Sequence, residues 1–356
     1  AAWDAKFQQF VEANPDKAAQ LSKMMNREVP ANLLEELVAA APVEKPVATR
    51  ASSGTILQKA AALVPALYGG AADLAPSTKT DLKGVPYFSP ENRAGRNFHF
   101  GVRELGMGFI ANGMTLFGAA IAYSSTFFVF SDFMKPAIRL AALQKLPVIY
   151  VFTHDSFFVG EDGPTHEPIE QLAMLRTIPG MTVIRPAEAI ECAHAWAHAI
   201  TAQSPVALIL TRQDLRPLCE CARPKVALEK GAYVVSCEEG FEYILIGTGS
   251  ELNLALDTAE ELRKAGKKVR VVSMPSWELF LKQDKAYRDS VLPPSCKKRV
   301  SIEAGSTFGW EKFIGDEGLA IGLDHFGASA PYKVLTEKFG FTVPAVIEKM
   351  KAHFNF

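Results

Sequence analysis

The sequence predicts an α/β protein with two domains: a mostly parallel sheet with helices on both faces, followed by a smaller α/β unit. Short runs rich in Val, Ile and Leu alternate with helical patterns between residues 47 and 211, as in doubly wound sheets. The same alternation resumes after an irregular segment near residues 218–231. Of the 356 residues 48% are hydrophobic, which is enough to bury two cores of this kind.

Three segments follow one another along the chain. Residues 1–44 have the pattern of short amphipathic helices and form a helical linker that ends at a proline-rich connector. Residues 45–226 contain the candidate strands of the first sheet, which are FHFGV, AAIAYSST, PVIYVFTH, TVIRP and ALILT. Residues 227–356 contain those of the second sheet, which are YILIGTGS, KVRVVSMPS and RVSIEAGS.

Composition and charge argue against several classes of protein. The formal net charge is −1, so nothing in the balance attracts nucleic acid or an anionic membrane surface. Five irregularly spaced cysteines form no disulfide framework and suit the cytoplasm, and the pair Cys219 and Cys221 is expected to be structural thiols. The uncharged stretch 105–131 lacks an apolar run of about 18 residues, which argues against a membrane-spanning helix. Its lack of charge instead predicts a buried segment or the interface of a homodimer.

The segment THDSFFVGEDGPTHEP, residues 153–168, has the densest set of reactive side chains. It contains two imidazoles, His154 and His166, and two carboxylates, Asp155 and Asp162. It follows a predicted buried strand, and loops at the carboxyl ends of such strands face the ligand crevice of an open α/β sheet. A polar surface loop is the weaker interpretation, because two of only seven histidines fall in this one segment.

The stretch that begins at Glu104 supplies one carboxyl group and several aromatic rings. Glu104 is the last charged residue before the uncharged stretch, and loss of hydration there would favour its protonated form, a useful hydrogen-bond donor. Pairing with Arg103 or capping of the helix is an equally good interpretation. Further on, Phe127, Phe130 and Phe133 have helical spacing, and such stripes are more often core than ring-binding walls.

Four residues at element ends are further candidates for ligand contacts. Asp73 and Ser77 fall in the turn-like segment GGAADLAPST. Arg50 and Arg212 each lie at the end of a predicted element, where a guanidinium group either binds phosphate through two hydrogen bonds or lies on the surface.

Six motifs follow one another from about Thr49 to the C-terminus: ADLAPS, GVRELGMG, the aromatic stretch after YSST, THDS…GEDGPTHEP, TRQDL and VVSMPS. Together they resemble the later half of a transketolase, and the order GEDGPTH is highly specific. The resemblance implies a pyrimidine-binding domain followed by a C-terminal domain. It also implies thiamine diphosphate as cofactor and transfer of a two-carbon ketol unit from a ketose phosphate to an aldose phosphate, in the pentose phosphate pathway.

The resemblance assigns cofactor contacts to five residues. Glu104 matches the glutamate that hydrogen-bonds the aminopyrimidine ring and favours the tautomer whose nitrogen removes the thiazolium C2 proton. An aromatic wall against the pyrimidine is matched by Phe127, Phe130 and Phe133. Asp73 matches a residue near the cofactor.

The same resemblance assigns substrate contacts. Asp162 matches the acceptor for a substrate hydroxyl, and His166 matches a histidine near the reacting carbons that donates to the developing alkoxide or shuttles a proton. The group that holds the sugar phosphate is matched by Arg50, Ser77, His154 and Arg212.

The chain departs from the family pattern in two ways. Phe133 stands where tyrosine is usual, and Phe157 and Phe158 replace a smaller Ile-Gly pair, which is expected to narrow the mouth of the cleft. The GDG…N motif that holds Mg²⁺ and the diphosphate is absent, and the GDEG at Gly315 lies in the other domain. We therefore expect this chain to bind cofactor poorly and to be inactive alone.

Three hypotheses follow. In the first, the chain is the C-terminal portion of a transketolase and needs the N-terminal diphosphate-binding domain, with the cofactor between domains of two subunits. In the second, it is a separate subunit of a two-chain transketolase, or belongs to a dihydroxyacetone synthase-like enzyme. In the third, it is a non-catalytic dimerisation scaffold.

Overall fold

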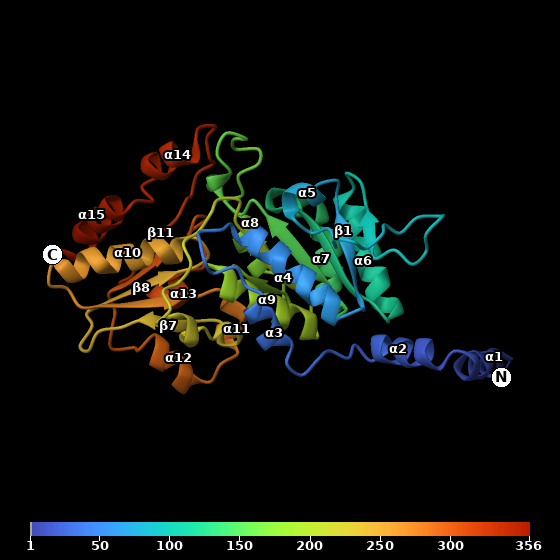
Figure 1. The fold of residues 1–356 in the computed structure, drawn as a ribbon. Coiled ribbons are helices and arrows are strands. Elements are labelled where there is room, and N and C mark those ends of the chain that lie inside the picture. Colours follow the sequence, from blue (N-terminus) through green and yellow to red (C-terminus); the bar gives the residue numbers. More distant parts are fainter. Residues whose placement is uncertain (1) are drawn as a thin grey trace.

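The computed structural model describes residues 2–356, which form two α/β domains side by side (Figure 1). The first domain has a six-stranded sheet with the order β2-β1-β3-β4-β6-β5, parallel throughout. This confirms the predicted parallel sheet. Its strands are β1 (Leu67–Ala71), β2 (Asn97–His99), β3 (Ile121–Phe127), β4 (Ile149–Thr153), β5 (Thr182–Ile184) and β6 (Val206–Leu210).

The second domain has a five-stranded mixed sheet with the order β11-β10-β8-β9-β7. Only the pairing of β7 with β9 is antiparallel within this sheet. Its strands are β7 (Tyr233–Ser236), β8 (Tyr243–Gly247), β9 (Val269–Ser273), β10 (Arg299–Ile302) and β11 (Leu319–Ile321). The helix α10 (Glu251–Lys264) lies against β8 and β9, and α15 (Val343–Phe354) packs on α10.

Helices cover both faces of the first sheet. Successive residues of a strand point to opposite faces, so Ile149 and Val151 pack with α3 (Leu33–Ala39), α4 (Thr49–Leu63) and α9 (Ala189–Thr201). Tyr150 and Phe152 pack on the other face, with α6 (Glu104–Phe117), α7 (Ser131–Leu143) and α8 (Gln171–Arg176). Burial on both faces explains why these strands appear in the sequence as continuous apolar runs.

The remaining elements are short or peripheral. The N-terminal helices α1 (Ala2–Ala13) and α2 (Pro15–Met25) extend away from both domains and contain no buried residue among those described (Figure 1). No helix in residues 2–356 is long and apolar enough to cross a membrane. The other helices are α5 (Ala75–Thr78), α11 (Trp277–Leu281), α12 (Lys285–Val291), α13 (Glu311–Ile314) and α14 (Tyr332–Lys338).

Strand β1 was not predicted, because its sequence LYGGA contains two glycines and these disfavour strands. The structure shows why both glycines are needed. A Cβ at Gly69 would lie 2.1 Å from the carbonyl oxygen of Tyr123, and a Cβ at Gly70 would lie 2.0 Å from that of Phe98. Both neighbouring strands therefore approach β1 too closely for any larger residue.

A buried group of charged side chains joins the two domains. Arg185, which follows β5, donates from Nε to Asp155 over 2.9 Å and from a terminal nitrogen to Glu251 at the start of α10. All three side chains are almost completely inaccessible to solvent. Burial alone would lower the pKa of Arg185, but the two carboxylates outweigh burial and raise it. Since Asp155 belongs to the segment after β4, the second domain helps to fix that segment.

The segment after β4, residues 154–168, forms a loop that also contacts the second domain near its C-terminal end, through Glu167. This side chain is buried beside Gly327, where an added Cβ would lie 1.6 Å from a carboxylate oxygen. Neither oxygen makes a well-aligned hydrogen bond with any described residue. Burial raises the pKa of Glu167 to about 7, although backbone groups of Ala328 and Gly160 oppose the increase.

We expect Arg185→Met to lower the free energy of unfolding by about 3–5 kcal/mol, because it removes the cationic partner of two buried carboxylates. The urea midpoint measures this loss. Arg216→Met is the matched control, since Arg216 pairs with Asp257 on the surface and such pairs contribute less than about 1 kcal/mol. Equal midpoint changes in the two variants would contradict the importance of the buried group.

We expect Glu167→Gln to stabilise the protein at about pH 8 by about 1–2 kcal/mol. The wild-type carboxyl ionises near its ordinary pKa of 4.5 in the unfolded chain but near 7 in the folded protein. Wild-type stability therefore falls as the pH rises from about 4.5 to 7, whereas the amide does not ionise. Urea midpoints across this range test the expectation, with Glu161→Gln on the exposed part of the same loop as control. A constant difference at all pH values would contradict it.

Candidate active site

Four neighbouring parallel strands end at one edge of the first sheet, and the predicted site residues follow them. Asp73 comes just after β1, Phe127 ends β3, His154 follows β4 and Arg212 follows β6. The sheet order β1-β3-β4-β6 places these strand ends next to one another. This is the edge where open α/β sheets bind ligands.

Aromatic rings form a continuous row at this edge. The ring centroids of Phe127 and His154 are 3.7 Å apart, and Phe127 and Phe130 are stacked at 6.1 Å. Phe130 continues the row to Phe133 at 6.1 Å and to His166 at 5.5 Å. The three phenylalanines do not share one helix: the chain leaves β3, makes one 3-10 turn (Phe128–Phe130) and then enters α7. Phe133 is 63% exposed, so the row ends at an open face.

His154 is buried in the left-handed region, with φ of 61°. Its Nδ1 lies 2.8 Å from the Thr153 hydroxyl, and its Nε2 lies 3.4 Å from a guanidinium nitrogen of Arg50. Burial, followed by the charges of Arg50 and Arg212, lowers the pKa of His154 to about 3. The ring is therefore neutral, and because a guanidinium can only donate, Nε2 accepts while Nδ1–H donates to Thr153.

Two guanidinium groups converge beside this neutral imidazole. Arg50, near the start of α4, donates to the carbonyl oxygen of Ser77 over 2.9 Å. Burial and the charge of the exposed Arg212 lower the pKa of Arg50. Among residues 2–356, neither arginine forms an ion pair within 4.0 Å. The group can therefore bind an anion without first breaking an ion pair.

Glu104 begins α6 and is only 8% exposed. Its Oε1 accepts a hydrogen bond of 3.3 Å from the hydroxyl of Thr126, the residue directly before Phe127. The neighbouring Arg103 instead donates to the carbonyl oxygen of Phe100, and Glu104 makes no side-chain cap at the described helix start. The buried carboxyl thus lies next to the strand end that carries the aromatic row.

The other predicted residues lie on exposed turns around this group. Asp73 is exposed in a turn with φ of 61°, and Asp162 is exposed at the tip of the loop after β4. His166 is partly exposed, with Nδ1 3.0 Å from the Thr165 hydroxyl. Sequence reasoning missed the role of Asp155, which pairs with Arg185 rather than facing the cleft. The near-continuous apolar pattern around Arg185 was the available signal, since a charge there needs a buried partner.

The expectation that Phe157 narrows the cleft is wrong. Phe157 is fully buried and packs on Phe339 and Phe341 of the second domain, with centroid distances of 5.2 and 5.1 Å. Phe158 stacks on Phe157 and reaches Tyr332 in α14. A large apolar pair at this point therefore joins the domains rather than occluding a substrate path.

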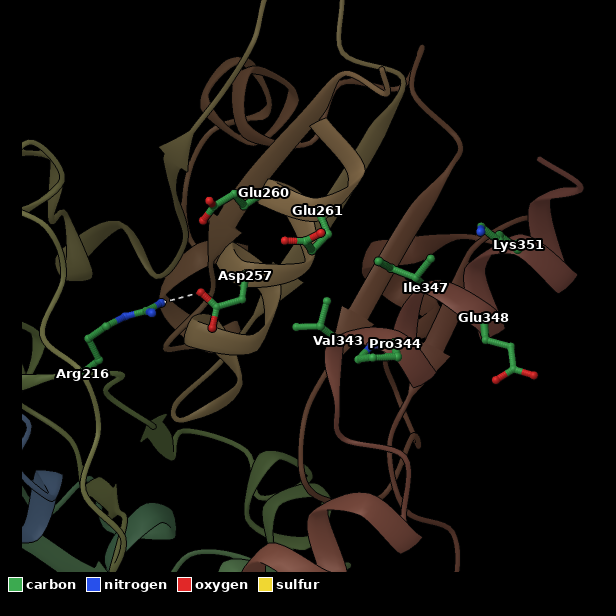
Figure 2. Close-up of a pocket in the computed structure, with 9 residues that line it drawn as sticks. All are labelled: Arg216, Asp257, Glu260, Glu261, Val343, Pro344, Ile347, Glu348 and Lys351. Carbon is green, nitrogen blue, oxygen red and sulfur yellow. Dashed lines mark hydrogen bonds and ion pairs between the residues drawn. The ribbon is translucent and has the colours of Figure 1, made fainter. Parts of the chain in front are cut away.

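A separate cavity of about 820 Å³ lies in the second domain between α10 and α15 (Figure 2). Asp257, Glu260 and Glu261 line it from the α10 side, and Val343 and Ile347 line it from the α15 side (Figure 2). The predicted site residues do not line it. In the described part of the chain, no group of three or more His, Cys, Asp or Glu side chains could hold a metal ion.

The side chains at the sheet edge fit one end of thiamine diphosphate. A planar aminopyrimidine needs an apolar face and a buried carboxyl near its edge, and the aromatic row with Glu104 offers both. The diphosphate end needs a metal, and no group of three or more His, Cys, Asp or Glu side chains in residues 2–356 could hold one.

Comparison with known proteins agrees with this geometry. Residues 45–217 match the family model of the transketolase pyrimidine binding domain, and residues 231–342 match that of the transketolase-like C-terminal domain. Curated transketolases of Geobacillus stearothermophilus and Bacillus subtilis are 49% and 48% identical to 99% of this chain. The chain spans about half of their length, 53% in each case.

Solved structures give the same relationship. A transketolase from Leishmania mexicana superposes with a TM-score of 0.92 at 38% identity, over 99% of this chain and 51% of that chain. A structure described as a split gene transketolase, inactive beta4 tetramer, has a TM-score of 0.71 at 26% identity over 87% of this chain and 99% of that chain. The chain therefore belongs to the transketolase family, of which it has the pyrimidine-binding and C-terminal domains.

Proposed function

We propose that this chain supplies the pyrimidine-binding half of an active site that transfers a two-carbon ketol unit from a ketose phosphate to an aldose phosphate. The observation that carries the proposal is the buried Glu104 carboxyl beside the aromatic row. Thiamine diphosphate, when bound, supplies the nucleophilic carbon for the ketose carbonyl. Action in the cytoplasm and in the pentose phosphate pathway follows from the family relationship and is part of this proposal.

Glu104 has the position to share a hydrogen with a pyrimidine ring nitrogen. Thr126 donates to Oε1, which leaves Oε2 for the ring. A hydrogen bond to a buried carboxyl is stronger than one in water, because the surroundings have a low effective dielectric constant. Phe127, Phe130 and Phe133 would face the ring, each stacking contact adding about 0.5–1.5 kcal/mol beyond burial.

Arg50 and Arg212 are the proposed contacts for the sugar phosphate. His154 and the Ser77 carbonyl oxygen would hold the Arg50 guanidinium in place, since His154 Nε2 accepts from it. Because the imidazole of His154 stays neutral, it adds no positive charge that would repel the Arg50 and Arg212 guanidinium groups.

Asp162 and His166 are the proposed contacts for the sugar chain. Asp162 is exposed and can accept a hydrogen bond from a substrate hydroxyl. His166 lies at the edge of Phe130 and can donate a hydrogen bond to an oxygen on which negative charge develops.

The proposed partners are a diphosphate-binding domain, which would supply Mg²⁺, and a second copy of this chain. The helix α6 leaves Phe109 and Ile110 about half exposed and Phe117 84% exposed, although it contains no charged residue after Glu104. Such an apolar face on a surface helix suits a homodimer interface. A purely monomeric chain in sedimentation equilibrium would contradict this assignment.

A two-chain transketolase is the second candidate. It is favoured by the similarity to the split gene transketolase, because this chain covers 99% of that chain. Co-purification of a separate diphosphate-binding polypeptide would support it, whereas a single longer chain in the source cells would exclude it.

We expect Glu104→Gln to lower turnover about a hundredfold to ten-thousandfold when the chain is combined with a diphosphate-binding half, thiamine diphosphate and Mg²⁺. The amide can accept and donate, but it cannot take up or release the proton that tautomerisation requires. Coupled assay of the aldose phosphate product measures turnover, and circular dichroism checks the fold. Glu91→Gln, at an exposed loop, is the matched control.

Unchanged turnover in Glu104→Gln would favour a non-catalytic dimerisation scaffold. Comparison of formaldehyde with an aldose phosphate as acceptor distinguishes a dihydroxyacetone synthase-like activity from transketolase in the same assay.

We expect Arg212→Gln to raise KM for a phosphorylated aldose about tenfold to a hundredfold with little change in kcat. A charge-assisted hydrogen bond of about 1.5–3 kcal/mol is lost from both ground and transition states. An unphosphorylated aldose should show no such change. Arg216→Gln, four positions along and paired with Asp257, is the control. Equal effects on both sugars would contradict a phosphate contact.

A further inference from the structure

Two cysteines outside the candidate active site lie next to each other on the surface. The sulfur atoms of Cys219 and Cys221 are 2.6 Å apart, and both side chains are exposed. Exposure contradicts the expectation of structural thiols, which are usually buried, as Cys192 is. The pair lies in the segment between strands β6 and β7, which connects the two domains.

A turn holds the two sulfurs on the same side of the chain. The N–H of Ala222 donates to the carbonyl oxygen of Cys219 over 2.9 Å. On either side Leu218 and Ala222 are buried, and Arg223 donates to the carbonyl oxygens of Leu218 and Val43. Both ends of the turn are therefore fixed to the rest of the protein, while the thiols are exposed. The two sulfur atoms can form a bond without a change in the surrounding fold.

The two thiols are electrostatically different. The hydrogen bond with Cys221 lowers the pKa of Cys219, and backbone N–H groups and Lys225 act in the same direction. The same hydrogen bond raises the pKa of Cys221. Thiolate, the reactive form, is therefore favoured at Cys219, while Cys221 keeps its proton.

A small reagent can reach the pair. Both cysteines line a cavity of about 580 Å³ that also includes Lys225 and Arg263. Lys225 favours anionic sulfur at Cys219, in an opening large enough for a peroxide.

We propose that Cys219 and Cys221 form a redox modification site at which a hydroperoxide converts two thiols into one intramolecular disulfide. The Cys219 thiolate attacks the outer peroxide oxygen, the O–O bond breaks, and the products are a sulfenic acid and, after protonation, an alcohol or water. The Cys221 sulfur then attacks the sulfenic sulfur, the S–S bond forms, and hydroxide leaves as water with the Cys221 proton. Two electrons pass from the sulfurs to the peroxide, and a dithiol reductant reverses the change.

The disulfide would restrict the motion of the connection between the domains. Arg216, three residues before Cys219, pairs with Asp257 on α10 (Figure 2). Arg212 of the candidate active site lies on the same segment of the chain. A ring closed between Cys219 and Cys221 removes conformational freedom from this connection. The proposal stands on the turn and its thiols alone, so it is independent of ketol transfer.

The test uses the full chain, first reduced and then treated with hydrogen peroxide, followed by alkylation, digestion and mass spectrometry without reductant. We expect a peptide in which Cys219 and Cys221 carry no alkyl group and have lost two hydrogen atoms. Cys237, an exposed thiol elsewhere, should be alkylated. Before oxidation Cys219 should be alkylated at least about twofold faster than Cys237. Dithiothreitol should restore alkylation at both positions.

Single variants separate the two roles. In Cys221→Ser we expect Cys219 to be trapped by dimedone as the sulfenic acid, whereas Cys219→Ser should give no adduct at position 221. Cys237→Ser is the control and should form the disulfide as the wild type does. Alkylation of Cys219 and Cys221 to the same extent as Cys237 after peroxide, or disulfides only between two copies of the chain, would overturn the proposal.

Discussion

The buried Arg185 is the constraint on which both the domain arrangement and the site depend. A guanidinium taken out of water loses several kcal/mol of hydration, which only close partners offset. Asp155 and Glu251 are those partners, and they belong to different domains. Because such pairs recover little more than the desolvation free energy, the group fixes geometry rather than adding much net stability. The domains cannot shift relative to each other without exposing or separating these charges.

The fixed position of Asp155 has a direct consequence for His154. His154 precedes it in a left-handed conformation, and this backbone places the ring against Phe127 and Arg50. Burial of the imidazole there, followed by the charges of Arg50 and Arg212, lowers its pKa and keeps it neutral. The buried ion pair therefore helps to fix the backbone next to the ring, whereas burial and the two arginines set its protonation.

The sequence predicts the helices and strands well where neighbouring residues alone determine the structure. Apolar runs such as PVIYVFTH predicted β4 because both faces of that strand are buried. The strand order, which decides which loops meet, was not predicted. Strand β1 was missed because Gly69 and Gly70 are required by neighbours distant in sequence. The role of Asp155 was missed for the same reason, since its partner Arg185 follows another strand, β5. No local pattern shows that Phe157 packs on Phe339 and Phe341.

The second domain contributes none of the predicted site residues, yet it contacts the loop after β4 at both ends. Near the start of the loop, Glu251 holds Arg185 and so Asp155. Near the end, Glu167 is buried against Gly327, directly after His166. Asp162 lies between these two fixed ends and stays exposed. A loop fixed at both ends loses little further conformational entropy when a ligand binds. The second domain therefore orders the loop that carries Asp162 and His166 before any ligand binds.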